Sequence, residues 1–280
     1  MDTYRRRKLI DVLARSACVA AAFVALVPLV SVTLYVLTRG MGGLSLSLFT
    51  ELPKPVGESG GGFGNAVLGS LELVGLACAV GIPIGVLSGV YLSEFGRGRL
   101  ANAVRFSADV MAGIPSIAVG IFVYTLVVLT MRRFSALAGG IALGILMLPT
   151  VTRTTEELLK LVPDALREAG LALGIPKWRV ILQVVLRTGA PGIVTGIMLA
   201  VARAAGETAP LLFTAFGNRF WSASLDKPIA SLPVQIFTYA VSPYDEWHRQ
   251  AWAAALVLMG TVLVLNIGAR LLTYRYGSAR

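Results

Sequence analysis

GAPGIVTGIMLAVARAAGETAPLLFTA, residues 189–215, is apolar for long enough to cross a bilayer, and it still carries two full charges. About 20 apolar residues span the roughly 30 Å hydrocarbon layer as a helix. Arg203 and Glu207 stand four positions apart, so on a helix they share one face. A charge at the bilayer centre costs about 2.5–3.5 kcal/mol on insertion scales and is rarely left facing lipid. The stretch therefore predicts a membrane helix and marks the charged pair as a candidate site.

Apolar runs of similar length recur along the chain. Of the 280 residues, 56% are hydrophobic and only 14% are charged, which is the composition of a polytopic membrane protein. We predict an all-α fold with six transmembrane helices. The predicted spans are 17–37, 65–92, 110–130, 136–152, 189–215 and 251–272. The first follows four basic residues, but its apolar run is too long for a signal peptide, so it is predicted to be a membrane helix.

The basic residues in the loops predict the orientation. With the N-terminus inside, 17 of the 25 Lys and Arg residues fall in inner segments and 7 in outer ones, and Arg203 is left within a span. An excess of basic residues marks the cytoplasmic side, so we expect both termini there. The net charge of +10 then reflects topology, and it gives no reason to expect a nucleic-acid partner.

Several chemistries have no support in the residues present. Gly never precedes Lys, so the phosphate-binding loop of P-loop ATPases is absent. Cys18 and Cys78 lie inside predicted spans and His248 lies in an outer loop, which excludes a metal centre built from them. No paired carboxylates or nucleophile with a base suggest catalysis. We predict a protein that is not an enzyme and binds neither metal nor cofactor.

The longest inner segment, Arg153–Thr188, is predicted to form a helical hairpin. Pro163 and Asp164 can begin a helix, Gly174 can end it, and Pro176 can begin another. In the second helix four apolar residues stand at positions i, i+3, i+4 and i+7, which lie on one face of an α-helix. They are Trp178, Ile181, Leu182 and Val185. Such a face favours docking of another protein; the alternative is a helix lying on the bilayer surface.

Glycine and proline are frequent inside the predicted spans, as in 81–89, 111–120, 139–150 and 189–196. Small residues let helices approach closely, and prolines kink helices where neighbours can satisfy the freed carbonyls. Tight packing explains the pattern, and a gated pathway would also require it.

The stretch REAGLALGIPKWRVILQVVLR, residues 167–187, resembles the EAA loop of ABC importer permeases. Glu168, Ala169 and Gly174 match the Glu-Ala-Ala-x-x-x-Gly core. Gly170 replaces its third residue, and Arg187 stands where a proline is usual. The resemblance implies that this loop, within 156–188, docks into a separate ATPase subunit. The docking residues it implies are Glu168, Ala169, Gly174, Pro176 and Trp178.

Three further stretches, 112–124, 202–215 and 246–258, are similar to permease subunits of the phosphate ABC importer, and the last favours the PstA-type subunit over the PstC-type. The resemblance implies a second, PstC-type permease, two cytoplasmic ATPase subunits and an extracytoplasmic phosphate-binding protein. It also implies the cytoplasmic (inner) membrane as location. The expected division is an N-terminal helix and outer loop (1–64), a permease core (65–272) and a cytoplasmic tail (273–280).

For the charged pair, two interpretations remain. Arg203 could line the path and hold an oxyanion in bidentate fashion, while Glu207 accepts a hydrogen bond from protonated phosphate and repels sulfate. Alternatively, the two could form an ion pair that only holds the bundle together. Thr208 is included in the predicted substrate path, although its hydroxyl could instead satisfy a carbonyl freed at a kink by Pro210.

Two other acidic residues lie at span depth. Asp109 is expected to serve a helix N-terminus, and Glu72 is left without an assigned partner. Competing functions are a permease for phosphonate, sulfate or molybdate, and a self-sufficient secondary transporter. The latter predicts inverted repeats and no docking hairpin, whereas the sequence contains the hairpin and no convincing repeat.

Overall fold

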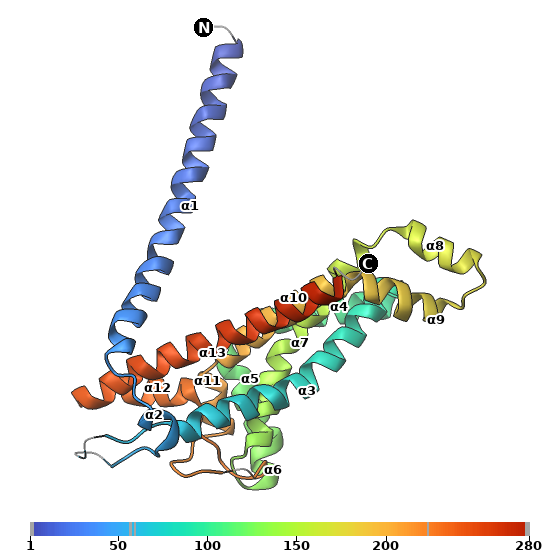
Figure 1. Ribbon diagram of the computed structural model, residues 1–280. Coiled ribbons are helices and arrows are strands. Elements are labelled where there is room, and N and C mark those ends of the chain that lie inside the picture. Colours follow the sequence, from blue (N-terminus) through green and yellow to red (C-terminus); the bar gives the residue numbers. More distant parts are fainter. Residues whose placement is uncertain (1–2, 56–57, 59, 223, 278–280) are drawn as a thin grey trace.

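The computed structural model describes residues 3–55, 58, 60–222 and 224–277, and within them every regular element is a helix (Figure 1). The α-helices are α1 (Thr3–Met41), α2 (Ser47–Thr50), α3 (Gly64–Glu94), α4 (Arg99–Gly113), α5 (Ser116–Val123), α6 (Leu129–Met131), α7 (Ala136–Lys160), α8 (Asp164–Ala172), α9 (Lys177–Val180), α10 (Leu186–Ala205), α11 (Ala209–Thr214), α12 (Leu232–Ala240) and α13 (Asp245–Gly277). Two π-helical turns, η1 (Tyr124–Val128) and η2 (Ile181–Val185), join α5 to α6 and α9 to α10. The all-α prediction is confirmed.

Among the described residues, five helical stretches are long and apolar enough to cross a membrane, and a bent pair makes a sixth candidate. The pair is α4 with the α5–α6 stretch, and it turns by 105° between Gly113 and Ser116. The continuous span predicted at 110–130 is therefore wrong. Pro115 has no N–H to donate and disfavours helix at the preceding Ile114, which is extended with ψ 131°.

The core of the bundle is the packing of α3 on α7. The residues of α3 that face α7 recur every four positions, and three of them are glycines. They are Leu73, Ala77, Gly81, Gly85 and Gly89. A Cβ on Gly89 would lie 2.5 Å from the Cβ of Thr155, and one on Gly85 would lie 2.7 Å from the Cβ of Val151. The prediction that small residues bring these helices together is confirmed here.

This contact supports a first testable prediction. Gly89→Ala should destabilise the chain by about 1–3 kcal/mol, because the added methyl group forces two packed backbones apart. Gly75→Ala, on the same helix, is the matched control, since nothing lies within 4 Å of a Cβ there. Thermal unfolding of both purified variants in detergent measures the difference, and equal midpoints would contradict the packing argument.

The α10 helix runs antiparallel to α7, and their contacts set the depth of each residue. The contacts are Gly192 with Leu158, Gly196 with Thr154 and, beyond α10, Leu211 with Gly139. By this register Arg203 lies level with Met147, close to the midpoint of α7. The charged stretch is therefore at half height in the bundle.

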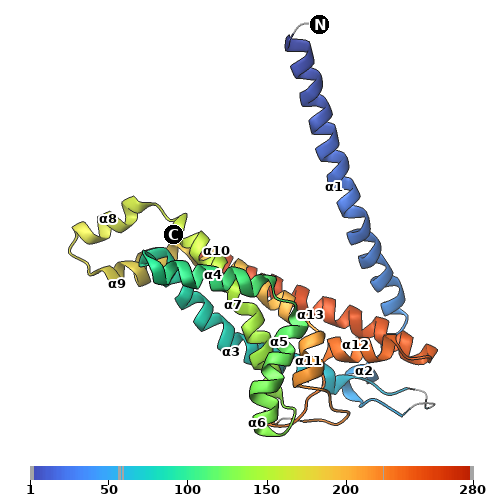
Figure 2. The ribbon, with the colours of Figure 1, turned by 180° about the vertical axis from the view of Figure 1, so that it is seen from behind.

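The α1 helix stands apart from the bundle, as two opposite views show (Figures 1 and 2). Only its C-terminal part packs, where Tyr35 meets Trp252 of α13 edge to face at 5.0 Å and Gly40 lies against Leu256. No residue of its most apolar 18-residue window is buried. Such a surface requires lipid or another apolar chain to cover it.

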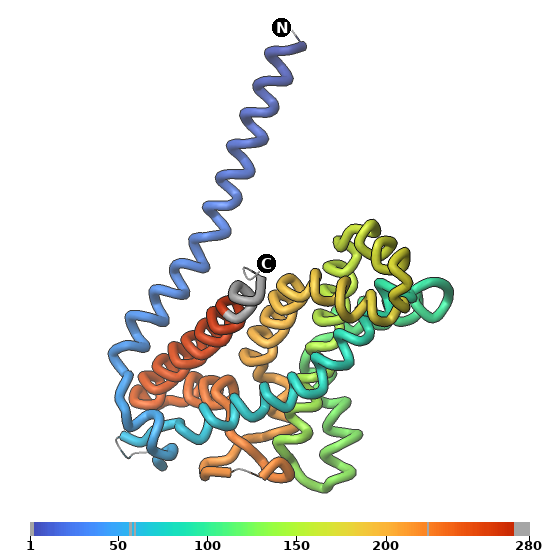
Figure 3. The backbone as a smooth tube through the Cα atoms, turned by 45° about the vertical axis from the view of Figure 1, so that its right-hand side comes forward, coloured from blue at the N-terminus to red at the C-terminus, as the bar shows by residue number. Residues whose placement is uncertain are grey.

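The helical hairpin, which we define as α8, the turn 173–176 and α9, projects from the end of the bundle remote from α2 and α12 (Figure 1). We call this the hairpin end. The last residues of α3 and α7 and the first of α10 lie there, and Figure 3 shows the hairpin beside the turn that follows α3.

Candidate functional site

The helical hairpin forms where the sequence predicts it. Pro163 is the N-cap of α8 with Asp164 in the first turn, and Gly174 ends this arm in the left-handed region with φ +74°. Pro176 is the N-cap of α9. A Cβ on Gly170 would lie 2.9 Å from Val180, so the glycine at the third position of the EAA core lets the two arms touch.

The expected single apolar face of the second arm is wrong. Ile181 and Val185 are buried, and Val185 packs in a cluster with Leu159, but Trp178 and Leu182 are exposed. The cause is η2, whose i to i+5 hydrogen bonds widen the turn and shift the side chains relative to an α-helix.

The hairpin thus presents apolar side chains to the outside. The large exposed ones are Leu166, Leu171, Leu173 and Trp178, and Leu182 of η2 is exposed directly after them. The five predicted docking residues are also exposed: Glu168, Ala169, Gly174, Pro176 and Trp178. Exposed apolar side chains gathered at a projecting tip are typical of surfaces that bind another protein or a membrane.

The charged stretch is a break between two helices. α10 ends at Ala205, residues 206–208 are not helical, and α11 begins at Ala209. The expectation that Arg203 and Glu207 share the face of one continuous helix is therefore wrong. The chain breaks because Pro210 cannot donate to an upstream carbonyl and instead occupies the first turn of a new helix.

The two charges remain close across this break. Arg203 Nε lies 3.7 Å from Glu207 Oε1, which is within ion-pair range and too long for a hydrogen bond. The Arg203 side chain is 56% exposed on the single chain, and that of Glu207 is 17% exposed. A guanidinium has five N–H donors, so this loose contact leaves Arg203 with donors for another group.

The structure does not show the expected hydrogen bond from Thr208. Its side chain makes no capping bond to α11, and Pro210 in the first turn frees no carbonyl. The break is held from α5 instead, where a Cβ on Gly120 would lie 2.7 Å from the Cα of Pro210. The hydroxyl of Thr214 donates to the Pro210 carbonyl at 2.8 Å. Arg203, Glu207 and Thr208 are thus brought together on a firmly packed segment.

The remaining predicted residues have simple surroundings. Asp109 pairs with Arg153 of α7, and its carboxylate accepts from Nε at 2.9 Å, so the expected role at a helix N-terminus is wrong. The Oε1 atom of Glu72 is buried and has no hydrogen-bond partner among the described residues. Cys18 and Cys78 are free thiols. In the described ranges, no three His, Cys, Asp or Glu residues are grouped to hold a metal ion.

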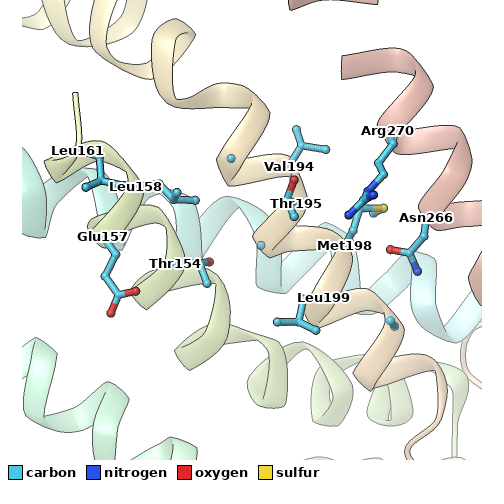
Figure 4. A pocket seen from close by; sticks show the side chains of 13 residues that line it. Thr154, Glu157, Leu158, Leu161, Val194, Thr195, Met198, Leu199, Asn266 and Arg270 are labelled. Atoms are coloured by element: carbon cyan, nitrogen blue, oxygen red, sulfur yellow. The ribbon is translucent and has the colours of Figure 1, made fainter. Parts of the chain in front are cut away.

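A groove of about 660 Å³ lies between α7, α10 and α13 (Figure 4). Glu157 comes from α7, Thr195 and Met198 from α10, and Asn266 and Arg270 from α13. None of the three predicted path residues lines it. The groove and the charged break are therefore separate features.

A charged network at the hairpin end escapes prediction from the sequence. Glu156 of α7 is 1% exposed and accepts from Arg105 Nε at 2.7 Å and from Lys160 Nζ at 2.6 Å. Arg105 also donates to the carbonyl of Leu92 at 3.0 Å. Spacing along the helix could have predicted the Lys160 contact, at i to i+4, and a contact of Arg153 with Glu156 at i to i+3. It could not have predicted the Arg105 contact, because Arg105 and Glu156 are 51 positions apart.

Known proteins share this architecture. The family described as binding-protein-dependent transport system inner membrane component matches residues 81–277. The fold is similar to a chain of the MetNI methionine ABC transporter in an inward-facing conformation, with TM-score 0.59, 17% identity and 76% and 93% of the two chains covered. A chain of an amino acid ABC transporter gives TM-score 0.57 at 15% identity, with 76% and 92% covered. The chain therefore belongs to the family of binding-protein-dependent transport system inner membrane components.

Within the family, its curated relatives are phosphate transport system permease proteins PstA. That of Yersinia pestis is 53% identical over 84% of this chain and 80% of its own. That of Xylella fastidiosa is 46% identical over 97% and 95%, and PstA 1 of Mycobacterium tuberculosis is 39% identical over 96% and 90%. This chain is thus a permease of the PstA type.

Proposed function

We propose that this chain is the membrane-spanning half of an ATP-driven importer of inorganic phosphate. Its partners are a second, PstC-type permease, two cytoplasmic ATPase subunits and an extracytoplasmic phosphate-binding protein. Both termini and the helical hairpin face the cytoplasm, and the complex lies in the inner membrane. Residues 65–272 form the permease core, and 1–64 supply the N-terminal helix and the first outer loop.

The observation that carries the proposal is the helix break at half height. Irregular backbone at membrane depth is tolerated where it is buried in protein or lines a water-filled cavity. Discontinuous helices near the midplane form substrate sites in many transporters. Here the break also carries an exposed arginine at 56%, which cannot face lipid without cost. A substrate path along this surface, completed by the second permease, would keep both the irregular backbone and the arginine away from lipid.

The chemistry of the break suits phosphate. A guanidinium offers paired donors that match an oxyanion. Glu207 accepts hydrogen bonds and donates none when ionised, so it tolerates an anion that retains a proton, as phosphate does near neutral pH. Sulfate and molybdate have no such proton at that pH. A few contacts suffice, because a substrate held at many points would not leave.

The hairpin supports the coupling to a separate ATPase. The residues it exposes include Trp178 and Leu173, while its inner side chains pack on α7 and α10. A partner could therefore bind the tip and push on the bundle. The path of the chain supports one side of the membrane for both termini. The end of α1 packs beside the first part of α13, and the start of α1 and the end of α13 both lie away from this contact, toward the same side of the bundle (Figure 1).

Transport by proteoliposomes tests the function. Vesicles holding both permeases, with the ATPase and ATP in the lumen and the binding protein outside, should accumulate phosphate and little sulfate or molybdate. A non-hydrolysable ATP analogue should abolish uptake. Accumulation of another oxyanion would assign the alternative substrate, and ATP-independent transport by this chain alone would assign a secondary transporter.

Glu207→Gln gives a second test of selectivity. Loss of the carboxylate removes a charged hydrogen bond to the phosphate hydroxyl, worth about 1.5–3 kcal/mol, together with the repulsion of sulfate. The ratio of phosphate to sulfate flux should fall about tenfold or more. Counterflow through the permease pair at millimolar anion, without binding protein, measures this ratio. Glu246→Gln on α13 is the control, and an unchanged ratio in Glu207→Gln would contradict the role of Glu207.

A further inference from the structure

Arg167, the residue before the EAA core, ties α8 to the end of α3. Its Nη2 donates to Glu94 Oε1 at 2.8 Å and its Nε to the same atom at 3.2 Å. The guanidinium also donates to the backbone carbonyls of Leu159 at 2.8 Å and Val162 at 2.5 Å. The side chains of Arg167 and Glu94 are only 18% and 5% exposed. One side chain thus joins α3, the end of α7 and α8.

The ion pair between Arg167 and Glu94 is strong because both groups are charged and largely buried. The hydrogen bond to Glu94 raises the pKa of Arg167 above its ordinary value, against the opposing effect of burial. Removing Arg167 would leave the nearly buried Glu94 carboxylate without its charge partner, which is strongly unfavourable. Arg167 itself also pairs with exposed Asp164 on α8, at 3.1 Å. The contact with Glu94 is therefore a firm connection and differs from exposed surface pairs, which contribute little.

The second arm of the hairpin holds the same residue. Lys177 Nζ donates to the Glu94 carbonyl at 3.0 Å and lies 4.3 Å from the centre of the Phe95 ring. The two arms therefore converge on the last turn of α3, beside which the hairpin lies in Figure 3. Because Gly170 and Val180 pack the arms together, the hairpin and this turn form one unit.

From the end of α3 the connection continues into the bundle. Arg105 of α4 caps the Leu92 carbonyl and pairs with buried Glu156 of α7. Along its length α3 packs on α7 through Gly85 and Gly89. Residues joined by such packing and ion pairs can carry a displacement between distant sites. Without the tie to Glu94, α8 would no longer be joined to α3 through Arg167, and its remaining bonds from Arg167 reach only the end of α7 and the turn after it, at Leu159 and Val162. That turn could bend and absorb a displacement of α8.

We propose that Arg167 and Glu94 form a positioning link that transmits movement of the ATPase-docked hairpin to α3, and so couples ATP hydrolysis to opening of the path. The inference rests on the proposed function and adds a role that the docking surface itself does not supply. Arg167 is the positioning residue. The tip binds the motor, and the link prevents the hairpin from moving independently of the bundle.

The complete importer in proteoliposomes tests the link through uptake per ATP hydrolysed. In Arg167→Gln and Glu94→Gln this ratio should fall about fivefold or more, the scale of coupling between sites, while the ATPase stays bound and basal hydrolysis persists. The double variant should be no worse than Arg167→Gln alone, because that substitution already removes the pair with Glu94. Arg167→Lys, which keeps the charge, should be intermediate. Arg249→Gln, which removes an exposed pair with Glu246 on α13, is the matched control.

A covalent bridge separates coupling from stability. With Cys18 and Cys78 replaced by Ser, Glu94→Cys and Arg167→Cys can be joined by a short bis-methanethiosulfonate linker. Bridging should restore most of the lost uptake per ATP, and reduction should abolish it again. Normal coupling in the assembled Gln variants, or no recovery on bridging, would overturn the link. Failure of the proposed function is distinguishable, because the unsubstituted complex would then transport no phosphate.

Discussion

Replacement of Arg203 by Gln is expected to lower phosphate uptake by the assembled importer about 100-fold or more. Two charged hydrogen bonds to the anion are lost, each worth about 1.5–3 kcal/mol, and a total near 3 kcal/mol already corresponds to about 100-fold. Glu207, 3.7 Å away, would then repel the passing anion without compensation. Uptake of labelled phosphate at saturating ATP measures the loss.

Two controls make this result specific to the guanidinium. Arg203→Lys keeps the charge but offers no planar pair of donors, so uptake should be intermediate. Arg249→Gln on α13 should transport normally. Co-purification of both permeases with the ATPase establishes assembly. If Arg203→Gln transports at the normal rate in an intact complex, Arg203 has a structural role only.

The second large effect is expected at the tip of the helical hairpin. Trp178 is 56% exposed there, and buried tryptophans are among the strongest contributors to protein interfaces, at about 2 kcal/mol or more when truncated. Trp178→Ala should therefore weaken binding of the ATPase subunit about 30-fold or more. Titration of purified ATPase onto the permease pair in nanodiscs measures the affinity.

Trp221→Ala provides the matched control for this substitution. Trp221 is also exposed, at 47%, but it follows α11 at the opposite end of the bundle from the helical hairpin. ATPase affinity should be unchanged in this variant. Equal affinities for the Trp178 and Trp221 variants would show that the ATPase docks elsewhere.

Local signals predicted the hairpin well. Pro163, Asp164, Gly174 and Pro176 specify helix ends through interactions within a few residues. Accordingly, α8 begins at Asp164 and ends before Gly174, and α9 begins directly after Pro176. The π-helical turn η2 was not predictable in this way, because no helix-end signal marks residues 181–185, and Val185 within it is buried with Leu159 of α7 and Ile193 of α10. The α-helical period predicted that Trp178 and Val185 lie on the same face of the second helix. This prediction is wrong, because Trp178 is exposed and Val185 is buried.

The prolines predicted where the membrane helices are irregular, but they did not predict whether each irregularity is a kink or a break. The sequence left Pro210 as a kink within one helix. The structure has a break, held by the close approach of Gly120 from a helix about 90 positions away. Likewise, Pro115 separates two helices at 105°. Whether a proline kinks or ends a membrane helix depends on which neighbours satisfy the freed backbone groups, and no single stretch contains that information.

By itself, the sequence determined the class of protein, four of the six spans, the hairpin and the depth of Arg203, because hydropathy, helix ends and inserted charges act over short distances along the chain. Only the tertiary structure decided that the charged stretch is a helix break and that Arg167 holds Glu94, 73 positions away. Those features depend on side chains brought together by packing. The energies of these packing contacts and ion pairs are comparable to the cost of burying a charge. The spacing of residues within one helix does not predict them.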